Sequence, residues 1–306
     1  MTFAVLLKTH FFDAAIAERY ARLVRESPRD ARGFIALNRG NEPARLPADT
    51  LGVPPAAFFL FNHEQLLALA FPTKCARQGW QLNPGNADLI PLLFMARHPA
   101  YDPVWGIEYD VHFEGAWRRL FDHFRGSDAD LLATTIHRQV ETPQKVLTPP
   151  FRSPEFADWP EDERIRAFLP IYGLSRRGAA AIEKAYRAGA GGHYELTWAT
   201  ILHHAGLVLE DIGGNGEWVR PENVNRFYFN TKHTYSMSPG TFVFRPNLSR
   251  VMRRPNTLWH PVKPARAPVW HGLTFRGARG VVEAAKPKVF ALVVRSWFLT
   301  RWNRLR

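Results

Sequence analysis

The sequence has almost no cysteine and no long apolar run. Its 306 residues include one cysteine, Cys75, so internal disulfides and cysteine-based zinc fingers are excluded and a reducing compartment is expected. The best apolar run near the C-terminus, residues 289–294, is far shorter than the roughly 18 to 20 residues that span a bilayer. Residues 1–8 have no basic leader and no small-residue cleavage site, which argues against a secretory signal. The expected location is therefore the cytoplasm.

Acidic residues are nearly missing from the end of the chain. Residues 241–306 contain 14 lysines and arginines and one acid, Glu283, whereas residues 1–240 contain 26 basic and 27 acidic residues. The whole excess behind the net charge of +12 therefore lies in the C-terminal region. A basic appendage on a neutral body is typical of a surface that binds a polyanion, either an anionic membrane leaflet or nucleic acid.

Short apolar runs alternate with helical patterns along the chain. Strands are expected over residues 3–8, 34–37, 57–61, 105–111, 130–136, 168–174 and 207–209, and helices over 14–25, 88–97, 116–124, 175–186 and 193–205. This alternation predicts a single α/β domain with a mixed, mostly parallel sheet flanked by helices. Residues 139–160 contain five prolines and predict a long loop, which either covers a substrate or is an inert surface loop.

The strand expected over 105–111 ends in an acid-X-acid triplet, Glu108-Tyr109-Asp110. Period-two alternation puts both carboxylates on one face of this strand. Two carboxylates at a strand end of an open α/β sheet suit Mg²⁺ or Mn²⁺, which also accept water and phosphate oxygens as ligands. Taken alone, such a triplet is more often a solvated strand end.

Two further groups of polar residues are candidates for chemistry. Glu195 follows the glycine-rich stretch 189–192, where a carboxylate either complements the dipole of the helix that begins there or acts as a general base. A base at this place needs burial or a second acid to restore the basicity that the dipole lowers. His260 and Lys263 lie in a proline-containing stretch, where an imidazole can complete a metal shell and an ammonium can neutralise a diphosphate. A lone histidine is more often structural.

The order of these motifs resembles that of the GT-A type nucleotide-sugar glycosyltransferases. An early βαβ unit, an acid-X-acid strand, a glycine-rich turn leading into a helix, and a late histidine follow one another along residues 3–263. The segments 105–113 and 258–263 are also similar to a group of poorly characterised bacterial proteins related to that family. The resemblance implies a GT-A-like catalytic domain over residues 1–264, followed by a basic, aromatic tail over 265–306.

The resemblance also implies a role for each motif residue. Asp110 and His260 would ligate a divalent cation, Mn²⁺ or Mg²⁺, and Glu108 would contact the cation or the ribose of the donor. Lys263 would face the diphosphate, and Glu195 would be the base that deprotonates the acceptor hydroxyl in an inverting reaction. The implied activity is metal-dependent transfer of a sugar from a nucleotide-sugar donor to an envelope or lipid-linked acceptor.

The composition of the tail agrees with this activity. Residues 286–306 mix arginine, tryptophan and phenylalanine without an acid, which suits the headgroup region of an anionic membrane. This interpretation makes the enzyme a peripheral protein on the inner face of the cell membrane, with no nucleic acid as partner. The alternative is a non-catalytic α/β protein that binds nucleic acid or another polyanion through the same tail. A nucleotidyl or phosphoryl transferase would share the carboxylates and the metal, but the sequence has no Gly-x-x-x-x-Gly-Lys-Ser/Thr loop.

Overall fold

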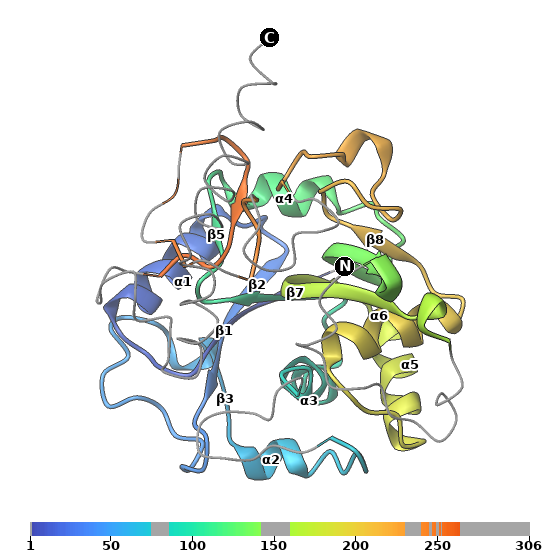
Figure 1. Cartoon of the computed structure of the whole chain (residues 1–306). Helices are drawn as coiled ribbons and strands as arrows, with labels where there is room; N and C mark the ends of the chain where they lie inside the picture. The colour runs from blue at the N-terminus through green and yellow to red at the C-terminus, as the bar shows by residue number, and fades with distance from the viewer. Residues whose placement is uncertain are drawn as a thin grey trace, which may run out of the picture.

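A seven-stranded sheet forms the centre of the molecule (Figure 1). The computed structural model describes residues 2–74, 86–141, 160–229, 240–244, 247–248, 251 and 253–263. The strand order is β3-β2-β1-β4-β7-β6-β8. The strand bounds are Phe3–Thr9 for β1, Ala31–Asn38 for β2, Phe58–Phe61 for β3, Val104–Glu108 for β4, Leu131–Arg138 for β6, Ile165–Leu174 for β7 and Leu209–Asp211 for β8. Strand β7 runs antiparallel to β4 and β6, and the other neighbours pair in parallel.

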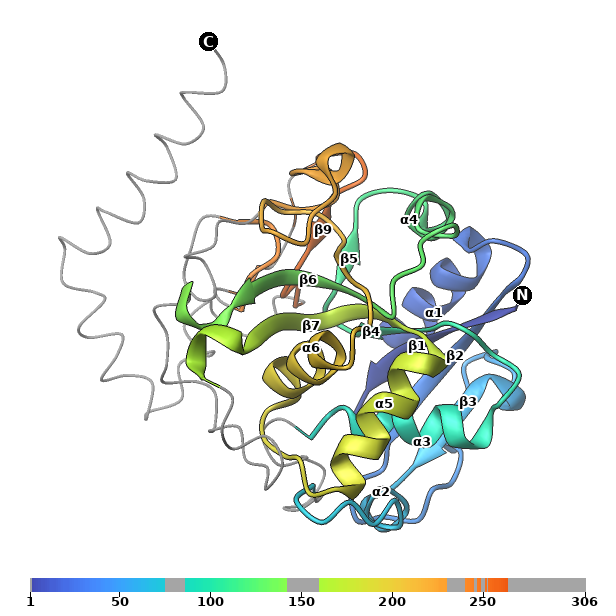
Figure 2. The same ribbon diagram turned by 90° about the vertical axis from the view of Figure 1, so that its right-hand side faces the viewer.

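Helices cover both faces of this sheet (Figure 2). One face carries α1 (Ala14–Glu26) and α4 (Trp117–His123). The other face carries α3 (Leu89–Arg97), α5 (Arg176–Arg187) and α6 (Tyr194–His204), with the short α2 (His63–Leu67) against α3. Single 3-10 turns lie at Pro55–Ala57, Gln139–Glu141, Glu161–Glu163 and Pro221–Asn223. No helix among the described residues combines the length and the apolar character that crossing a membrane requires.

Side-chain acceptors begin the three longest helices. Asp13 at the start of α1, Ser175 at the start of α5 and His193 at the start of α6 each accept a hydrogen bond from a backbone N–H of the first turn. This bond stabilises the helix end because the first N–H groups of a helix have no partner inside it. The helices predicted to begin at these three residues are confirmed.

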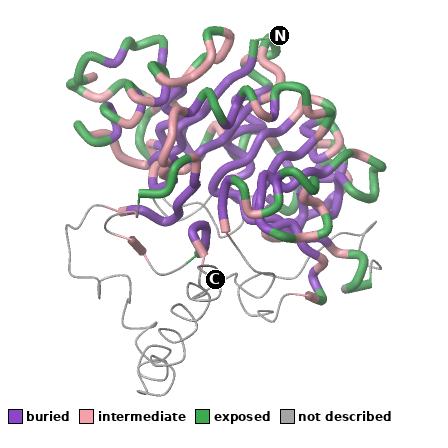
Figure 3. Tube along the Cα trace, turned by 90° about the horizontal axis from the view of Figure 1, so that it is seen from above, coloured by how far each residue is buried: buried purple, intermediate pink, exposed green. Residues whose placement is uncertain are grey.

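The alternation of side chains along the inner strands produces two hydrophobic cores, one on each face of the sheet. On β1, Ala4 and Leu6 belong to the core under α3, α5 and α6, whereas Val5 and Leu7 belong to the core under α1 and α4. Lys8 continues the first series, so its side chain lies on the α6 face where the strand is about to end. Buried residues gather in the interior of the described part of the chain, and exposed residues lie mostly at its periphery (Figure 3).

A second, two-stranded sheet lies close to the carboxyl end of β4. It consists of β5 (His112–Phe113) and β9 (Leu258–Trp259), which pair antiparallel and lie side by side in Figure 2. Strand β5 follows β4 after the turn 109–111. The pairing therefore brings the last described segment of the chain to the edge of the sheet where β1 and β4 end.

The predicted α/β architecture with a mixed, mostly parallel sheet flanked by helices is confirmed, and it is Rossmann-like. The strand predicted over 105–111 is wrong at its end. Strand β4 stops at Glu108, and Tyr109 and Asp110 form a turn in which the N–H of Val111 donates to the carbonyl of Glu108 at 3.0 Å. Of the predicted loop 139–160, residues 142–159 lie outside the described residues, and so does the whole tail 265–306.

Candidate metal centre

Glu108 and Asp110 lie where the central strand β4 ends. Strand β4 pairs in parallel with β1, and Lys8 is the register partner of Glu108. Strand alternation places Glu108 on the α6 face of the sheet. The second carboxylate is positioned by the turn at Tyr109 and Asp110 instead of by alternation. Both acids thus occupy the carboxyl edge of the sheet, where open α/β folds bind their ligands.

The pairing of β5 with β9 brings His260 to the same place. His112 is the register partner of Trp259, so His260, the next residue of the chain, lies beside the turn that contains Asp110. The backbone N–H of Val262 donates to the carbonyl of Asp110 at 2.7 Å and joins the two segments directly. Two parts of the chain that are far apart in the sequence therefore meet through backbone contacts that do not depend on the site's own side chains.

Three side chains converge at this edge. Potential ligand atoms of Glu108, Asp110 and His260 all lie within 4.8 Å of one another. Nε2 of His260 is 3.5 Å from Oδ1 of Asp110 and 3.9 Å from Oε2 of Glu108. Two carboxylates and one imidazole are a ligand set that suits Mn²⁺ and related divalent ions. The structure therefore brings together the residues that the sequence predicted to surround a cation.

The hydrogen bonding of His260 leaves one ring nitrogen available as a ligand. Its Nδ1 donates to the carbonyl oxygen of Val243 at 2.8 Å. Because a carbonyl only accepts, the ring proton is on Nδ1, and in the neutral imidazole Nε2 carries a lone pair. In that form the lone pair and Oδ1 of Asp110 are two acceptors 3.5 Å apart, and a positive charge between them, either a proton on Nε2 or a cation, makes the contact favourable. Metal-ligating histidines commonly have such a hydrogen bond on their second nitrogen.

Oδ1 of Asp110 also lacks a hydrogen-bond donor among the described residues. Asp110 is buried, and this atom accepts no hydrogen bond within the part of the chain that the structure describes. Burial acts to raise the pKa of the Asp110 carboxyl, but His260 and Lys263 outweigh it and hold the pKa below its ordinary value. The side chain is therefore ionised at neutral pH. An unsatisfied buried acceptor costs roughly 1 to 3 kcal/mol, more when charged, and a hard cation is the partner that fits it.

Each of the two carboxylates also has a lysine beside it. Nζ of Lys8 is 3.5 Å from Oε1 of Glu108, and Nζ of Lys263 is 3.3 Å from Oδ2 of Asp110. The two lysines differ in exposure, since 6% of the Lys8 side chain is accessible but 36% of the Lys263 side chain. Burial raises the pKa of Glu108 and lowers the pKa of Lys8, and in each case the charge of the partner opposes the shift.

Glu195 lies in the first turn of α6, on the face of the sheet that also carries Glu108. It is buried and accepts a hydrogen bond from the backbone N–H of Leu169 at 3.4 Å, and its Oε2 is 3.7 Å from Nδ1 of His193. The pKa of Glu108 is raised first by burial and in smaller part by the charge of Glu195, so the two carboxylates are electrostatic neighbours. Glu195 is thus buried at the start of α6 with a second acid, Glu108, nearby.

A buried ion pair holds the glycine-rich turn that precedes Glu195. Nζ of Lys74 lies 2.9 Å from Oδ2 of Asp88 and donates to the carbonyl of Gly192 at 2.8 Å. The hydroxyl of Tyr186 donates to the same carboxylate. Gly192 has a φ of 130°, which residues with a side chain rarely adopt. This network binds the turn directly before α6, the helix that carries Glu195.

Lys8 and Lys74 were missed by the sequence analysis. A signal for Lys8 exists, because a lysine that ends an otherwise apolar strand places a charge at the carboxyl edge of the sheet. No comparable signal exists for Lys74, because the groups it binds come from distant segments of the chain.

The chain matches no protein-family model and no curated protein. Support for a function therefore comes from the fold and from the geometry of the metal centre. Glu108, Asp110 and His260, with Lys8 and Lys263 beside them, form a compact charged site at the edge of a Rossmann-like sheet.

Proposed function

We propose that this protein is a metal-dependent glycosyltransferase of the GT-A type, which moves a sugar from a nucleotide-sugar donor to an envelope or lipid-linked acceptor by an inverting reaction. The observation that carries the proposal is the facing pair of acceptors, Oδ1 of Asp110 and Nε2 of His260, 3.5 Å apart at the carboxyl end of β4. In other Rossmann-like sheets nucleotides bind at this edge, which supports the proposal. A cation held there, together with Lys263, would supply the positive charge that a diphosphate requires.

The residues of the site divide the work of sugar transfer. Negative charge develops on the diphosphate as its bond to the anomeric carbon of the sugar breaks. Asp110 and His260 would hold the divalent cation, whose charge stabilises this leaving group. Lys263 would add a second positive charge to the same phosphates. Glu195 would accept the proton of the acceptor hydroxyl as the new carbon–oxygen bond forms.

The charge of the C-terminal tail supports the proposed class of acceptor. Residues 265–306 carry nine lysines and arginines and one acid, together with several tryptophans and phenylalanines. Such a segment binds anionic headgroups, and it would hold the enzyme at the membrane face where lipid-linked acceptors are located. The same charge also supports the alternative function, polyanion binding without catalysis, which predicts steeply salt-dependent binding of DNA or RNA.

Calorimetric titration of the full-length protein tests the donor. A panel of nucleoside diphosphates and nucleotide sugars is titrated in Mn²⁺ and again in EDTA. The proposal expects binding of one nucleotide class in Mn²⁺ and loss of that binding in EDTA. Absence of binding across the panel by folded protein contradicts the proposal, and salt-dependent binding of DNA that disappears on deletion of residues 265–306 supports the alternative.

Glu195→Gln tests the proposed base. Glutamine keeps the size of the side chain and the acceptor for the N–H of Leu169, but it does not take up a proton. We expect sugar transfer to fall by a factor on the order of 100 or more, with donor affinity nearly unchanged. Glu183→Gln on α5 is the matched control, because it removes the same charge away from the site. Lost donor binding in Glu195→Gln would assign Glu195 to a structural role.

A further inference from the structure

Lys8 is a buried positive charge inside the candidate metal centre. It ends the apolar part of β1, and the parallel register with β4 places it directly beside Glu108. Its Nζ lies 3.5 Å from Oε1 of Glu108, while the other carboxylate oxygen, Oε2, lies 3.9 Å from Nε2 of His260. One oxygen of the Glu108 carboxylate therefore lies near Lys8, and the other lies near His260, a member of the metal triad.

The surroundings of Lys8 keep its ammonium in place. Its Nζ lies 4.8 Å from the centre of the Tyr172 ring, is inaccessible to solvent, and makes no hydrogen bond to any described residue. Tyr172 in turn packs over Gly106, where a Cβ atom would lie only 2.2 Å from Cζ of the ring. The ring of Tyr172, held against Gly106, therefore lies next to the Lys8 ammonium. Lys263 differs, because 36% of its side chain is exposed and it can turn toward a ligand.

With all four groups ionised, the pair of Glu108 with Lys8 and the pair of Asp110 with Lys263 each sum to zero before any cation enters. The carboxylate of Glu195 nearby adds one negative charge. A divalent cation bound among these residues therefore adds two positive charges, of which the neighbouring side chains neutralise at most one. Its binding becomes favourable when a ligand with two or more negative charges arrives with it, because opposite charges at contact distance attract strongly in a partly buried site.

We propose that Lys8 is a built-in competitor of the cation for Glu108, which keeps cation binding weak until a dianionic ligand of the diphosphate class binds with it. This inference rests on the proposed function for the identity of the ligand, and it names the form in which that ligand is taken up, a cation–diphosphate complex. Lys8 is a positioning residue in this scheme, because it acts through Glu108. The site then binds the cation and the diphosphate tightly when both are present, and it binds the cation alone only weakly.

Mn²⁺ binding by the wild type and by Lys8→Met tests the inference. Affinity for Mn²⁺ alone is measured by the electron paramagnetic resonance signal of free Mn²⁺. We expect Lys8→Met to bind Mn²⁺ about 10-fold more tightly or better, because a positive charge a few ångströms from the cation has been removed. Damage to the fold does not produce a gain of affinity. Lys184→Met, on the exposed side of α5, is the matched control and should change nothing. Asp110→Asn added to Lys8→Met should abolish the gain.

A second arm uses inorganic pyrophosphate, with its complexation of Mn²⁺ in buffer measured in parallel. Pyrophosphate should strengthen Mn²⁺ binding by the wild type at least about 10-fold, and by Lys8→Met distinctly less. Equal or weaker Mn²⁺ binding by folded Lys8→Met, or by Lys8→Gln if the first variant does not fold, overturns the inference. An unchanged Mn²⁺ affinity of the wild type in pyrophosphate overturns it as well. Neither arm uses a nucleotide sugar, so failure of the proposed function is seen separately in the calorimetric panel.

Discussion

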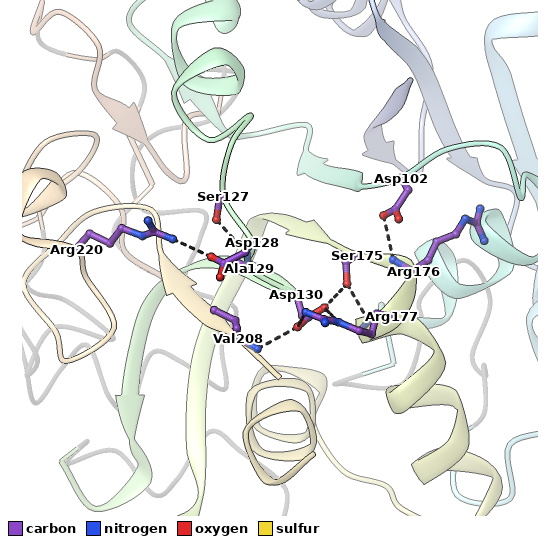
Figure 4. A network of polar contacts seen from close by, with 11 residues as sticks. Asp102, Ser127, Asp128, Ala129, Asp130, Ser175, Arg176, Arg177, Val208 and Arg220 are labelled. Atoms are coloured by element: carbon purple, nitrogen blue, oxygen red, sulfur yellow. Dashed lines mark hydrogen bonds and ion pairs between the residues drawn. The ribbon is translucent and has the colours of Figure 1, made fainter. Parts of the chain in front are cut away.

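Two buried aspartates at opposite edges of the sheet have opposite surroundings. Asp130 lies just before β6, at the amino edge, and Asp110 lies after β4, at the carboxyl edge. The carboxylate of Asp130 accepts four hydrogen bonds, from the hydroxyl of Ser175 at 2.7 Å, from two nitrogens of Arg177 at 2.8 and 2.7 Å, and from the N–H of Val208 at 3.0 Å (Figure 4). Oδ1 of Asp110 accepts none from the described residues.

The difference separates an acid that holds the fold together from an acid that is ready for a ligand. Each hydrogen bond that Asp130 accepts joins the start of β6 to the start of α5 or to the segment before β8. The side chain therefore stabilises the packing of those elements. Asp110 carries an ionised oxygen into a buried position beside Nε2 of His260. Such an arrangement lowers stability unless a positive charge lies between the two atoms. Burial alone therefore does not identify a functional acid, and an unsatisfied oxygen alone does not either, because Oδ1 of Asp88 also accepts no hydrogen bond from the described residues. What distinguishes Asp110 is its convergence with Glu108 and His260.

The largest expected effect is the loss of stability in Asp130→Ala. Removing this carboxylate leaves the N–H of Val208 and the hydroxyl of Ser175 without their acceptor and ends a charge-assisted pair with Arg177. We expect the free energy of unfolding to fall by about 3 kcal/mol. Urea unfolding followed by tryptophan fluorescence measures it, and the Mn²⁺ affinity of the folded variant should equal that of the wild type. A stable variant with impaired metal binding would reverse the assignment of the two acids.

Asp110→Asn should give the reverse pattern. The amide keeps the shape of the side chain but removes the charged oxygen that faces His260. We expect Mn²⁺ affinity in the presence of pyrophosphate to fall at least about 100-fold, or about 2.7 kcal/mol. The unfolding free energy of the metal-free protein should change by less than about 1 kcal/mol, because Oδ1 gives up no hydrogen bond from the described residues and the ion pair lost at Oδ2 is with the partly exposed Lys263. Unchanged Mn²⁺ binding would remove Asp110 from the metal centre.

A third buried acid, Asp211, extends the comparison of Asp130 with Asp110, because its charge changes near neutral pH. It accepts hydrogen bonds from the N–H groups of Ile136 and Gly213 and from the hydroxyl of Tyr228, yet burial raises its pKa to about 7. Because the folded state binds this proton more tightly than the unfolded state, the stability contribution is complete at acid pH and disappears as the pH rises through 7. We expect the unfolding free energy to drop by about 1.4 kcal/mol between pH 6 and pH 8.

The control for the pH dependence is Asp211→Asn, whose side chain does not titrate. The variant should be less stable at every pH, since the amide replaces an acceptor used by Ile136 or Gly213, but this part of the pH slope should be missing. If the unfolding free energies of the wild type and of Asp211→Asn changed equally with pH, Asp211 would keep its charge in the folded state. It would then resemble Asp130, whose carboxylate is fully hydrogen-bonded.

Local sequence signals predicted the elements of the fold well. Asp13 and Ser175 each begin a helix where a short polar acceptor precedes a periodic apolar pattern. The unbroken apolar run of residues 3–7 predicted β1. Successive side chains of a strand point to opposite faces, so a run that is apolar throughout is typical of a strand buried on both faces. The end of β4 was misplaced for the same reason that the other elements were found. Alternating residues continue through Asp110, and the hydrogen bond that turns the chain at Glu108 leaves no pattern in the sequence.

The residues of the metal centre could be named from the sequence, but the contacts between them could not be predicted from it. The acid-X-acid triplet and the late histidine each had an ordinary structural explanation. Their meeting depends on the β5–β9 register and on the bond from Val262 to the carbonyl of Asp110, which join distant segments. Lys8 had only a positional signal, a lysine near the end of an apolar strand, because its importance comes from being opposite Glu108 in the next strand.

The sequence by itself determined the α/β alternation, the helix starts and the concentration of positive charge after residue 240. These features follow from interactions between residues one to four positions apart, or from composition alone. Only the tertiary structure decided that Oδ1 of Asp110 faces Nε2 of His260, that Lys8 is held beside Glu108, and that Asp130 is fully hydrogen-bonded. The physical reason is that a buried polar atom is satisfied or left open by partners from other strands, and strand register and packing select those partners.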